Sequence, residues 1–125
     1  MHLCYGYATI GGKRLDPHYG RALRAVAASS ADQICLEYEQ PGHEPELLRD
    51  CGDKAVILGV LNLGTHEIEP VEHIAGRIRD ALQVVPPERL HLALDCGMWF
   101  LPRDVAFGKL RAMVVAADMV RGESG

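Results

Sequence analysis

A histidine and a cysteine stand two residues apart near the beginning of this chain, as His2 and Cys4. The surrounding residues 2–8 are mostly apolar or β-prone, which predicts a buried strand. Side chains two positions apart on a strand leave the same face, so this pair can converge on one metal ion. The spacing also fits a buried cysteine beside an ordinary histidine, and the pair alone leaves both interpretations open.

Two more candidate ligands lie where predicted strands end. Glu37 comes near the end of the apolar run 33–38, and Cys96 follows the apolar run 90–95. Functional groups of parallel α/β proteins collect at the carboxyl ends of strands, which brings these two positions into one region. Together with the first pair they form a set of one histidine, two cysteines and one glutamate, which suits zinc in tetrahedral coordination.

Other readings of the acidic and sulfur-containing residues remain open. Glu37 also fits a carboxylate at the rim of the sheet, in water or paired with an arginine, and Glu39 on the same strand face is an alternative ligand. Cys35 and Cys51 are interpreted as structural, because buried free cysteine is common. The remaining histidines lack ligand spacing and are expected to be solvated or satisfied by neighbours: His18, His43, His66, His73 and His91. No glycine-rich nucleotide loop and no Ser-His-Asp arrangement stands out.

The elements that must position these residues alternate along the chain. Strands are predicted at 2–8, 33–38, 55–61 and 90–95, where apolar or β-branched residues run together. Helical spacing, proline starts and glycine ends predict helices that begin at Asp16-Pro17, near Glu46, at Pro70 and before Ala106. The order βαβαβαβα predicts an α/β fold with a parallel sheet and right-handed crossovers, either open or part of a barrel. No linker divides residues 1–125, which are therefore expected to form one unit.

The composition narrows the classes of partner. Of the 125 residues, 48% are hydrophobic and 24% are charged, which is typical of a soluble protein with a core. Thirteen Lys and Arg against 17 Asp and Glu leave a net charge of −4, so a nucleic-acid partner is not expected. No apolar run approaches a membrane span and no signal-peptide pattern is found, so we expect a cytoplasmic protein with reduced cysteines.

Six stretches follow one another in the order of a known family: HLCYG at 2–6, DQICLE at 32–37, ILGVLN at 57–62, IAGRIRDAL at 74–82, PPERLHLALDCGM at 86–98 and KLRAMVVAA at 109–117. They resemble the C-terminal catalytic barrel of cobalamin-independent methionine synthase and its shorter relatives, which include epoxyalkane:coenzyme M transferases. The resemblance implies a zinc site made by His2, Cys4, Glu37 and Cys96.

The resemblance also implies an activity. In this family zinc holds the acceptor thiol as a thiolate, and a ligand set with two cysteinates and one carboxylate keeps that sulfur able to attack an alkyl carbon. The acceptor is homocysteine and the donor methyltetrahydrofolate in methionine synthase, whereas the coenzyme M branch opens an epoxide. Methionine synthases have an aspartate and then a histidine where this chain reads Asn62-Leu63-Gly64, which favours a non-folate donor here.

The chain matches only the last four strands of the eight-stranded family barrel. We therefore expect it to be the C-terminal part of a longer ancestral protein, with the α/β fold of half a TIM barrel. An open four-stranded sheet would leave two apolar edges exposed, which predicts a homodimer or a complementing half-barrel chain. The alternative hypothesis is an inactive truncated remnant, or a metal-binding or interaction module without a substrate pocket.

Overall fold

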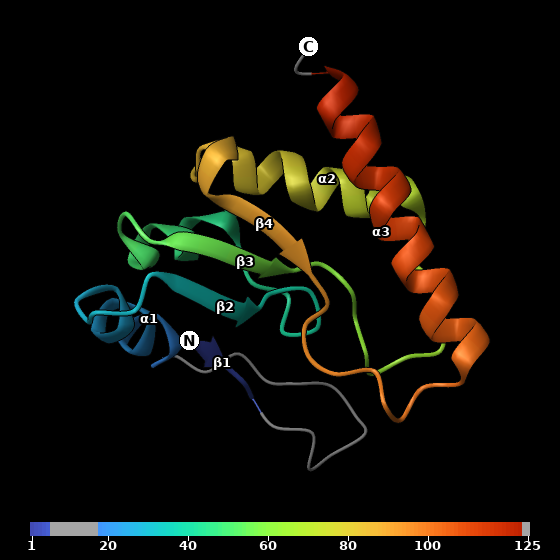
Figure 1. Ribbon diagram of the computed structural model, residues 1–125, viewed down its shortest axis with the longest axis horizontal. Helices are drawn as coiled ribbons and strands as arrows, with labels where there is room; N and C mark the ends of the chain where they lie inside the picture. Colours follow the sequence, from blue (N-terminus) through green and yellow to red (C-terminus); the bar gives the residue numbers. More distant parts are fainter. Residues whose placement is uncertain (6–17, 124–125) are drawn as a thin grey trace.

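Four parallel strands form a single sheet in the computed structural model, which describes residues 1–5 and 18–123 (Figure 1). The strands are β1 (His2–Leu3), β2 (Gln33–Glu37), β3 (Ala55–Gly59) and β4 (Leu90–Ala93), in the order β1-β2-β3-β4. Each pairs in parallel with the next. The predicted α/β fold with a parallel sheet is confirmed.

Helical segments connect or follow the strands. They are α1 (Tyr19–Ala27), the 3₁₀ helices η1 (Pro45–Cys51) and η2 (Pro87–Arg89), α2 (Val71–Leu82) and α3 (Arg103–Glu123). The segment predicted near Glu46 is thus a 3₁₀ helix, and it ends just before Gly52, whose φ of 59° favours glycine. The predicted helix start at Asp16-Pro17 and the end of the first predicted strand, residues 6–8, lie outside the described residues.

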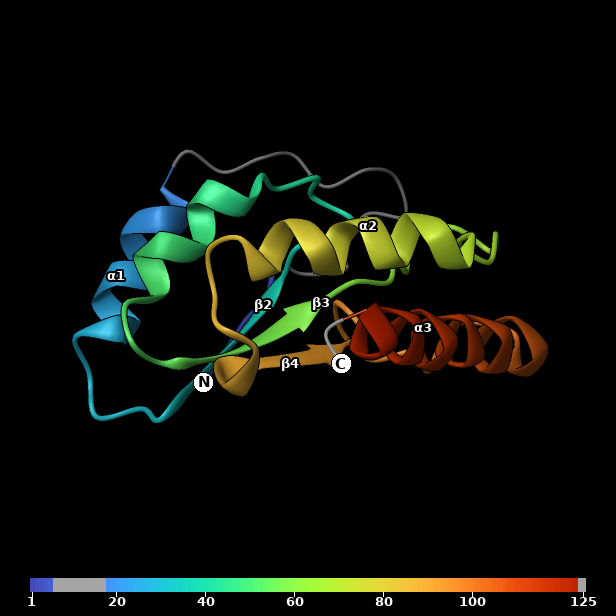
Figure 2. The ribbon, with the colours of Figure 1, turned by 90° about the horizontal axis from the view of Figure 1, so that it is seen from above.

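The strand order distinguishes a barrel from a doubly wound sheet. In a doubly wound sheet the order reverses at a switch point, which sends helices to both faces. Here the order never reverses, so right-handed crossovers place the helices on one face. Figure 2 shows α1 and α2 on the same side of the strands. This is the arrangement of a barrel wall, with helices outside and an inner face on the other side.

The core lies between the strands and these helices. Alternate strand residues that face the helices are completely buried, as shown by Ile34, Leu36, Val56 and Leu58. The other face carries a row of residues in register across all four strands, and its members are half-buried or exposed: His2, Cys35, Ile57 and His91. One face of the sheet is therefore covered, and the face that would form the inside of a barrel is accessible.

β2 ends at Glu37, before the predicted end at residue 38, because the chain changes hydrogen-bond partners there. After Glu37 the amides of Tyr38 and Gln40 donate to the buried carboxylate of Asp95 instead of to a neighbouring strand. None of the helices in the described part of the chain has the length and apolar character needed to span a bilayer.

Candidate metal centre

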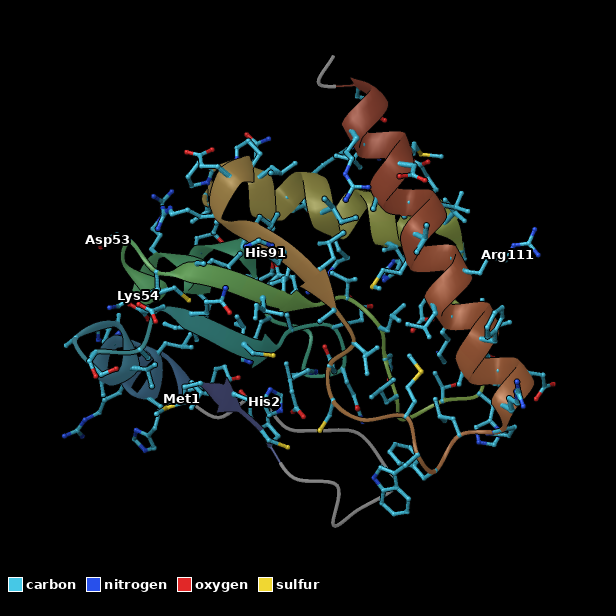
Figure 3. The ribbon with its side chains drawn as sticks, viewed as in Figure 1. Met1, His2, Asp53, Lys54, His91 and Arg111 are labelled. Atoms are coloured by element: carbon cyan, nitrogen blue, oxygen red, sulfur yellow. The ribbon has the colours of Figure 1, made fainter. Side chains whose placement is uncertain are left out.

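The four residues predicted as zinc ligands lie together. His2 is in β1, Cys4 follows it, Glu37 is the last residue of β2, and Cys96 comes three residues after β4. Each offers one ligand atom, and these atoms all lie within 4.8 Å of one another. His2, labelled in Figure 3, and Cys4 are exposed, whereas Glu37 is buried, so the group is open on one side.

The distances between the ligand atoms fit a tetrahedral metal site. The Sγ atoms of Cys4 and Cys96 are 3.8 Å apart. Two Zn–S bonds of about 2.3 Å at the tetrahedral angle place two sulfurs about 3.8 Å apart. The Cys4 thiol donates to Glu37 Oε1 over 3.2 Å. The sulfur atoms therefore already have the spacing that zinc requires.

Glu37 is oriented toward this group by the backbone. Its carboxylate is completely buried, and its Oε2 accepts the backbone N–H of Tyr5 at 3.0 Å. This bond leaves Oε1 directed at Cys4. A hydrogen-bond donor that binds one oxygen of a carboxylate fixes the orientation of the other oxygen toward a metal. The interpretation of Glu37 as a rim carboxylate in water is wrong, because the side chain has no exposed surface.

The chemistry of the donor set also fits zinc. Thiolate and imidazole ligands select zinc over magnesium and calcium, which prefer oxygen. When both thiols are deprotonated, Cys4, Cys96 and Glu37 bring three negative charges together. Such a cluster is costly without a compensating cation, because like charges in a partly buried site repel strongly. A divalent ion held by these residues and His2 removes that cost.

Glu39, the alternative ligand on the same strand face, is held elsewhere. Its two carboxylate oxygens bind His73 Nε2 at 2.6 Å and Arg77 Nε at 2.8 Å, both on α2. Arg77 also donates to the backbone carbonyls of Tyr38 and His43. The alternative is therefore excluded by geometry, and the Glu39 ion pairs instead fix the loop after β2 to α2.

Cys35 lies closer to the site than its interpretation as a structural cysteine suggests. Its Sγ is 3.1 Å from His2 Nδ1, although it is not one of the four grouped ligands. Burial raises the pKa of this thiol. Only the register of β1 against β2, which pairs His2 with Cys35, could have indicated this contact. Cys51 is buried in η1 as expected, and burial raises its pKa to about 12.

Sequence reasoning left His43 among the histidines without ligand spacing, and the structure places it inside an aromatic cluster. The rings of Tyr5 and Tyr19 stack at 4.6 Å, and those of Tyr19 and His43 stack at 4.9 Å. The Tyr5 hydroxyl lies 2.7 Å from His43 Nε2. Because Tyr5 directly follows Cys4, this cluster holds the segment that carries the ligand against the end of β2.

The stability of the chain is expected to fall as the pH is lowered through the titration range of His43. Burial and the nearby Arg77 lower the pKa of His43 from 6.5 to about 4. Between these values the unfolded chain binds more protons than the folded chain, so acid favours unfolding. The contribution of this group to the free energy of unfolding is up to about 3 kcal/mol above pH 6.5, and it is lost toward pH 4.

Urea unfolding at a series of pH values with chelator present measures this effect. His43→Gln, which keeps a polar partner for Tyr5, is the matched control. We expect a shallower decline for the variant between pH 6.5 and 4. Equal slopes for the two proteins would show that His43 does not contribute.

Gly64 in the sequence Asn62-Leu63-Gly64 lies next to the end of the Gln40 side chain. The Gly64 amide donates to Asn62 Oδ1 at 2.8 Å. A β-carbon at position 64 would lie 2.5 Å from Gln40 Nε2 and 3.2 Å from Asn62 Oδ1. A β-carbon at this position would therefore require the end of the Gln40 side chain to move.

Comparisons with known proteins identify the family of this chain. The family model described as "Cobalamin-independent synthase, Catalytic domain" matches residues 12–119. The methionine synthase of Sulfurisphaera tokodaii is 32% identical over 123 residues, which are 98% of this chain and 33% of the relative. That of Saccharolobus solfataricus is 32% identical over 126 residues, covering 98% and 34% of the two chains.

A solved structure gives the same result in three dimensions. The B12-independent methionine synthase from Shewanella sp. W3-18-1, in complex with selenomethionine, superposes with a TM-score of 0.86 and is 32% identical. The match covers 98% of this chain and 38% of that one. The chain thus spans 33–34% of the length of these curated relatives. It belongs to the cobalamin-independent methionine synthase family, of whose catalytic barrel its four strands and their helices form one segment.

Proposed function

We propose that this chain takes part in zinc-dependent transfer of a methyl or alkyl group to a small thiol, with homocysteine as the acceptor that its family membership favours. The observation that carries the proposal is the group of four ligand atoms within 4.8 Å. Its two sulfur ligands lie 92 residues apart in the sequence and 3.8 Å apart in space.

The residues of the site have separate tasks in this reaction. His2, Cys4, Glu37 and Cys96 would hold the zinc ion, which supplies a Lewis acid that keeps the acceptor thiol deprotonated near neutral pH. The negative charges of Cys4, Cys96 and Glu37 keep the acceptor sulfur electron-rich. In the transfer the sulfur forms a bond to the alkyl carbon while the bond from that carbon to the donor breaks.

This chain lacks the histidine that, in methionine synthases, stands where this chain reads Asn62-Leu63-Gly64 and could protonate the leaving group of the methyl donor. The end of the Gln40 side chain lies beside Gly64, where the family histidine is absent. Gln40 is not an acid at neutral pH and cannot protonate a leaving group as a histidine can. We infer that the donor is one whose leaving group needs no proton from this position. An activated methyl compound, whose leaving group departs without a proton, and a strained epoxide, whose alkoxide takes its proton from water, are the two classes to compare.

The proposal includes a second half-barrel, because the inner face of the sheet is accessible and the chain spans about a third of its curated relatives. An apolar groove of about 580 Å³ also runs beside β4 and between α2 and α3, lined in part by Leu82, Leu90, Leu92 and Val114. Both edge strands, β1 and β4, are parallel members of one sheet. Pairing β4 of one copy with β1 of another, twice around a two-fold axis, closes eight parallel strands.

We expect the purified chain to form a homodimer, with a mass by light scattering of twice the 13.7 kDa of one chain. The physical reason is that closure removes both sheet edges and covers the inner face. Adding a chain that carries the first half of a family barrel should then leave the mass of the homodimer unchanged. A monodisperse monomer that enlarges only on this addition would contradict the homodimer and support a complementing chain.

Zinc content and thiol alkylation together test the function. The purified chain is analysed for zinc per chain and then incubated with homocysteine and either methyltetrahydrofolate, an activated methyl donor or an epoxide. About one zinc per chain and a thioether product that disappears after chelation would support the proposal. Zinc binding without product, alone and with a complementing half, would favour a metal-binding module, and a metal-free chain would contradict the function altogether.

A further inference from the structure

We propose that Asp95 is a positioning residue that holds the end of β2 and the segment after β4 together, and so sets the distance between the ligands Glu37 and Cys96. The inference rests on the proposed metal centre and adds a residue that is not itself a ligand.

The spacing of Glu37 and Cys96 needs an explanation beyond strand pairing. Glu37 ends β2 and Cys96 follows β4, and β3 lies between these two strands. Neighbouring strands are about 4.8 Å apart, so strands on either side of a third are separated by about twice that distance. The four ligand atoms nevertheless lie within 4.8 Å of one another. The segment after β4 must therefore cross the end of β3 and be held there.

Asp95 supplies that connection through three consecutive amides. Its side chain is completely buried, and it directly precedes Cys96. Its Oδ1 accepts the N–H groups of Tyr38 at 3.0 Å and Glu39 at 3.2 Å, and its Oδ2 accepts that of Gln40 at 2.7 Å. These amides directly follow Glu37. The Asp95 side chain therefore links the position before the ligand Cys96 to the three residues that follow the ligand Glu37.

Gly59 at the end of β3 leaves the room that the Asp95 side chain occupies. A β-carbon on Gly59, the last residue of β3, would collide with Asp95 Oδ1 and lie 2.7 Å from Asp95 Cα. The Gly59 carbonyl also accepts the backbone N–H of Glu39 at 3.0 Å. Any larger residue at position 59 must push Asp95 away from the amides that it binds.

The chemistry of the three donors explains why a carboxylate is required. Both oxygens of the Asp95 side chain accept backbone N–H groups, whereas the amide of asparagine has one accepting oxygen and one NH₂ group. Asp95→Asn therefore keeps the volume but sets an NH₂ group against a backbone N–H. A buried donor without an acceptor is destabilising. We expect the loop after β2 to shift and Glu37 to move relative to Cys96.

The test compares the metal affinity and the metal spectrum of the full chain with those of its variants. Zinc affinity is measured by competition with a chelator, and the geometry of the site is read from the absorption bands of the cobalt(II) form. We expect Asp95→Asn to weaken zinc binding by about 10–100-fold, as for other groups that orient ligands. Its cobalt bands should shift as well. Gly59→Ala, which keeps Asp95 but displaces it, should change affinity and spectrum in the same direction.

The control separates positioning from general loss of stability. Ile78 on α2 is buried in the hydrophobic core and is not part of the metal centre. Ile78→Val is expected to lower the free energy of unfolding while leaving zinc affinity within about twofold and the cobalt spectrum unchanged. If Asp95→Asn binds zinc like the wild type with the same cobalt spectrum, the inference is overturned while the metal centre stands. If the wild-type chain binds no zinc, both are overturned.

Discussion

Replacing Cys96 by serine is expected to remove zinc from the purified chain. The substitution changes one of two sulfur ligands for a hydroxyl, which stays protonated near neutral pH and is a poorer ligand for zinc than a thiolate. Loss of a residue that only orients a ligand already weakens metal binding by about 10–100-fold, so loss of the ligand itself should cost more. Elemental analysis after dialysis and competition with a chelator measure the effect.

Cys35→Ser is the matched control for this prediction. The Cys35 thiol lies beside the site, with its Sγ 3.1 Å from His2 Nδ1, yet it is not in the group of four. The same chemical change is therefore made a few ångströms away. We expect this variant to retain about one zinc per chain. Zinc loss in Cys35→Ser with retention in Cys96→Ser would show that the two cysteines have been assigned the wrong way round.

Replacing Lys109 by methionine is expected to destabilise the fold by about 3–5 kcal/mol. Lys109 on α3 is completely buried, and its Nζ lies 3.1 and 3.0 Å from the two carboxylate oxygens of Glu69 and also donates to the Glu67 carbonyl. Methionine leaves the carboxylate of Glu69, which is only 8% exposed, without its cation. Guanidinium unfolding should show a lower midpoint with an unchanged slope.

Two further variants determine whether the unpaired buried charge of Glu69 causes the loss of stability in Lys109→Met. The double variant Lys109→Met with Glu69→Gln removes both charges and keeps an acceptor for the backbone N–H of Asn62, which donates to Glu69 Oε1 at 2.7 Å. It should recover much of the lost stability. Arg121→Met breaks an exposed pair with Asp118 on the same helix and should cost at most about 1 kcal/mol. An equal cost for Lys109→Met and Arg121→Met would contradict the buried-pair explanation.

Much of the fold follows from local signals in the sequence. Apolar runs and the proline and glycine residues at helix ends locate the strands and helices, and strict alternation predicts a parallel sheet. Pattern alone does not separate an open sheet from a barrel segment, because the strand order is a long-range property. The structure and the superposition on a family barrel supply that order.

The outer surface of the last helix is less predictable. Helical spacing indicates a buried stripe that includes Leu110 and Met113, yet Leu110 is 37% exposed and Lys109 is completely buried. The reason is that α3 packs mainly on α2, and its remaining apolar residues are left uncovered. Figure 3 shows Arg111 of this helix pointing away from the rest of the chain. A helical pattern identifies an apolar stripe but not the partner that covers it.

The site shows the same limit at the level of single residues. His2, Cys4, Glu37 and Cys96 could be identified from residue type, strand position and family resemblance, and the structure brings them together. The strand pattern alone does not choose between Glu37 and Glu39, because both lie on one strand face, and it is the pairing of Glu39 with His73 and Arg77 that separates them. The contact of Cys35 with His2 depends on strand register, which the sequence of either strand does not reveal.

The short first strand has a consequence for the order in which the site opens. β1 contributes two residues to the sheet, whereas β2 and β3 share a register of five residue pairs. Amide hydrogens of β1 should therefore exchange with solvent through local opening at a lower free energy than those of β2 and β3. Glu37 and Cys96 would stay in place during such openings, while His2 and Cys4 leave. A metal ion bound to all four ligands would cross-link the β1 segment to the segments that carry Glu37 and Cys96. Its removal should accelerate amide exchange in β1 while leaving exchange in β3 unchanged.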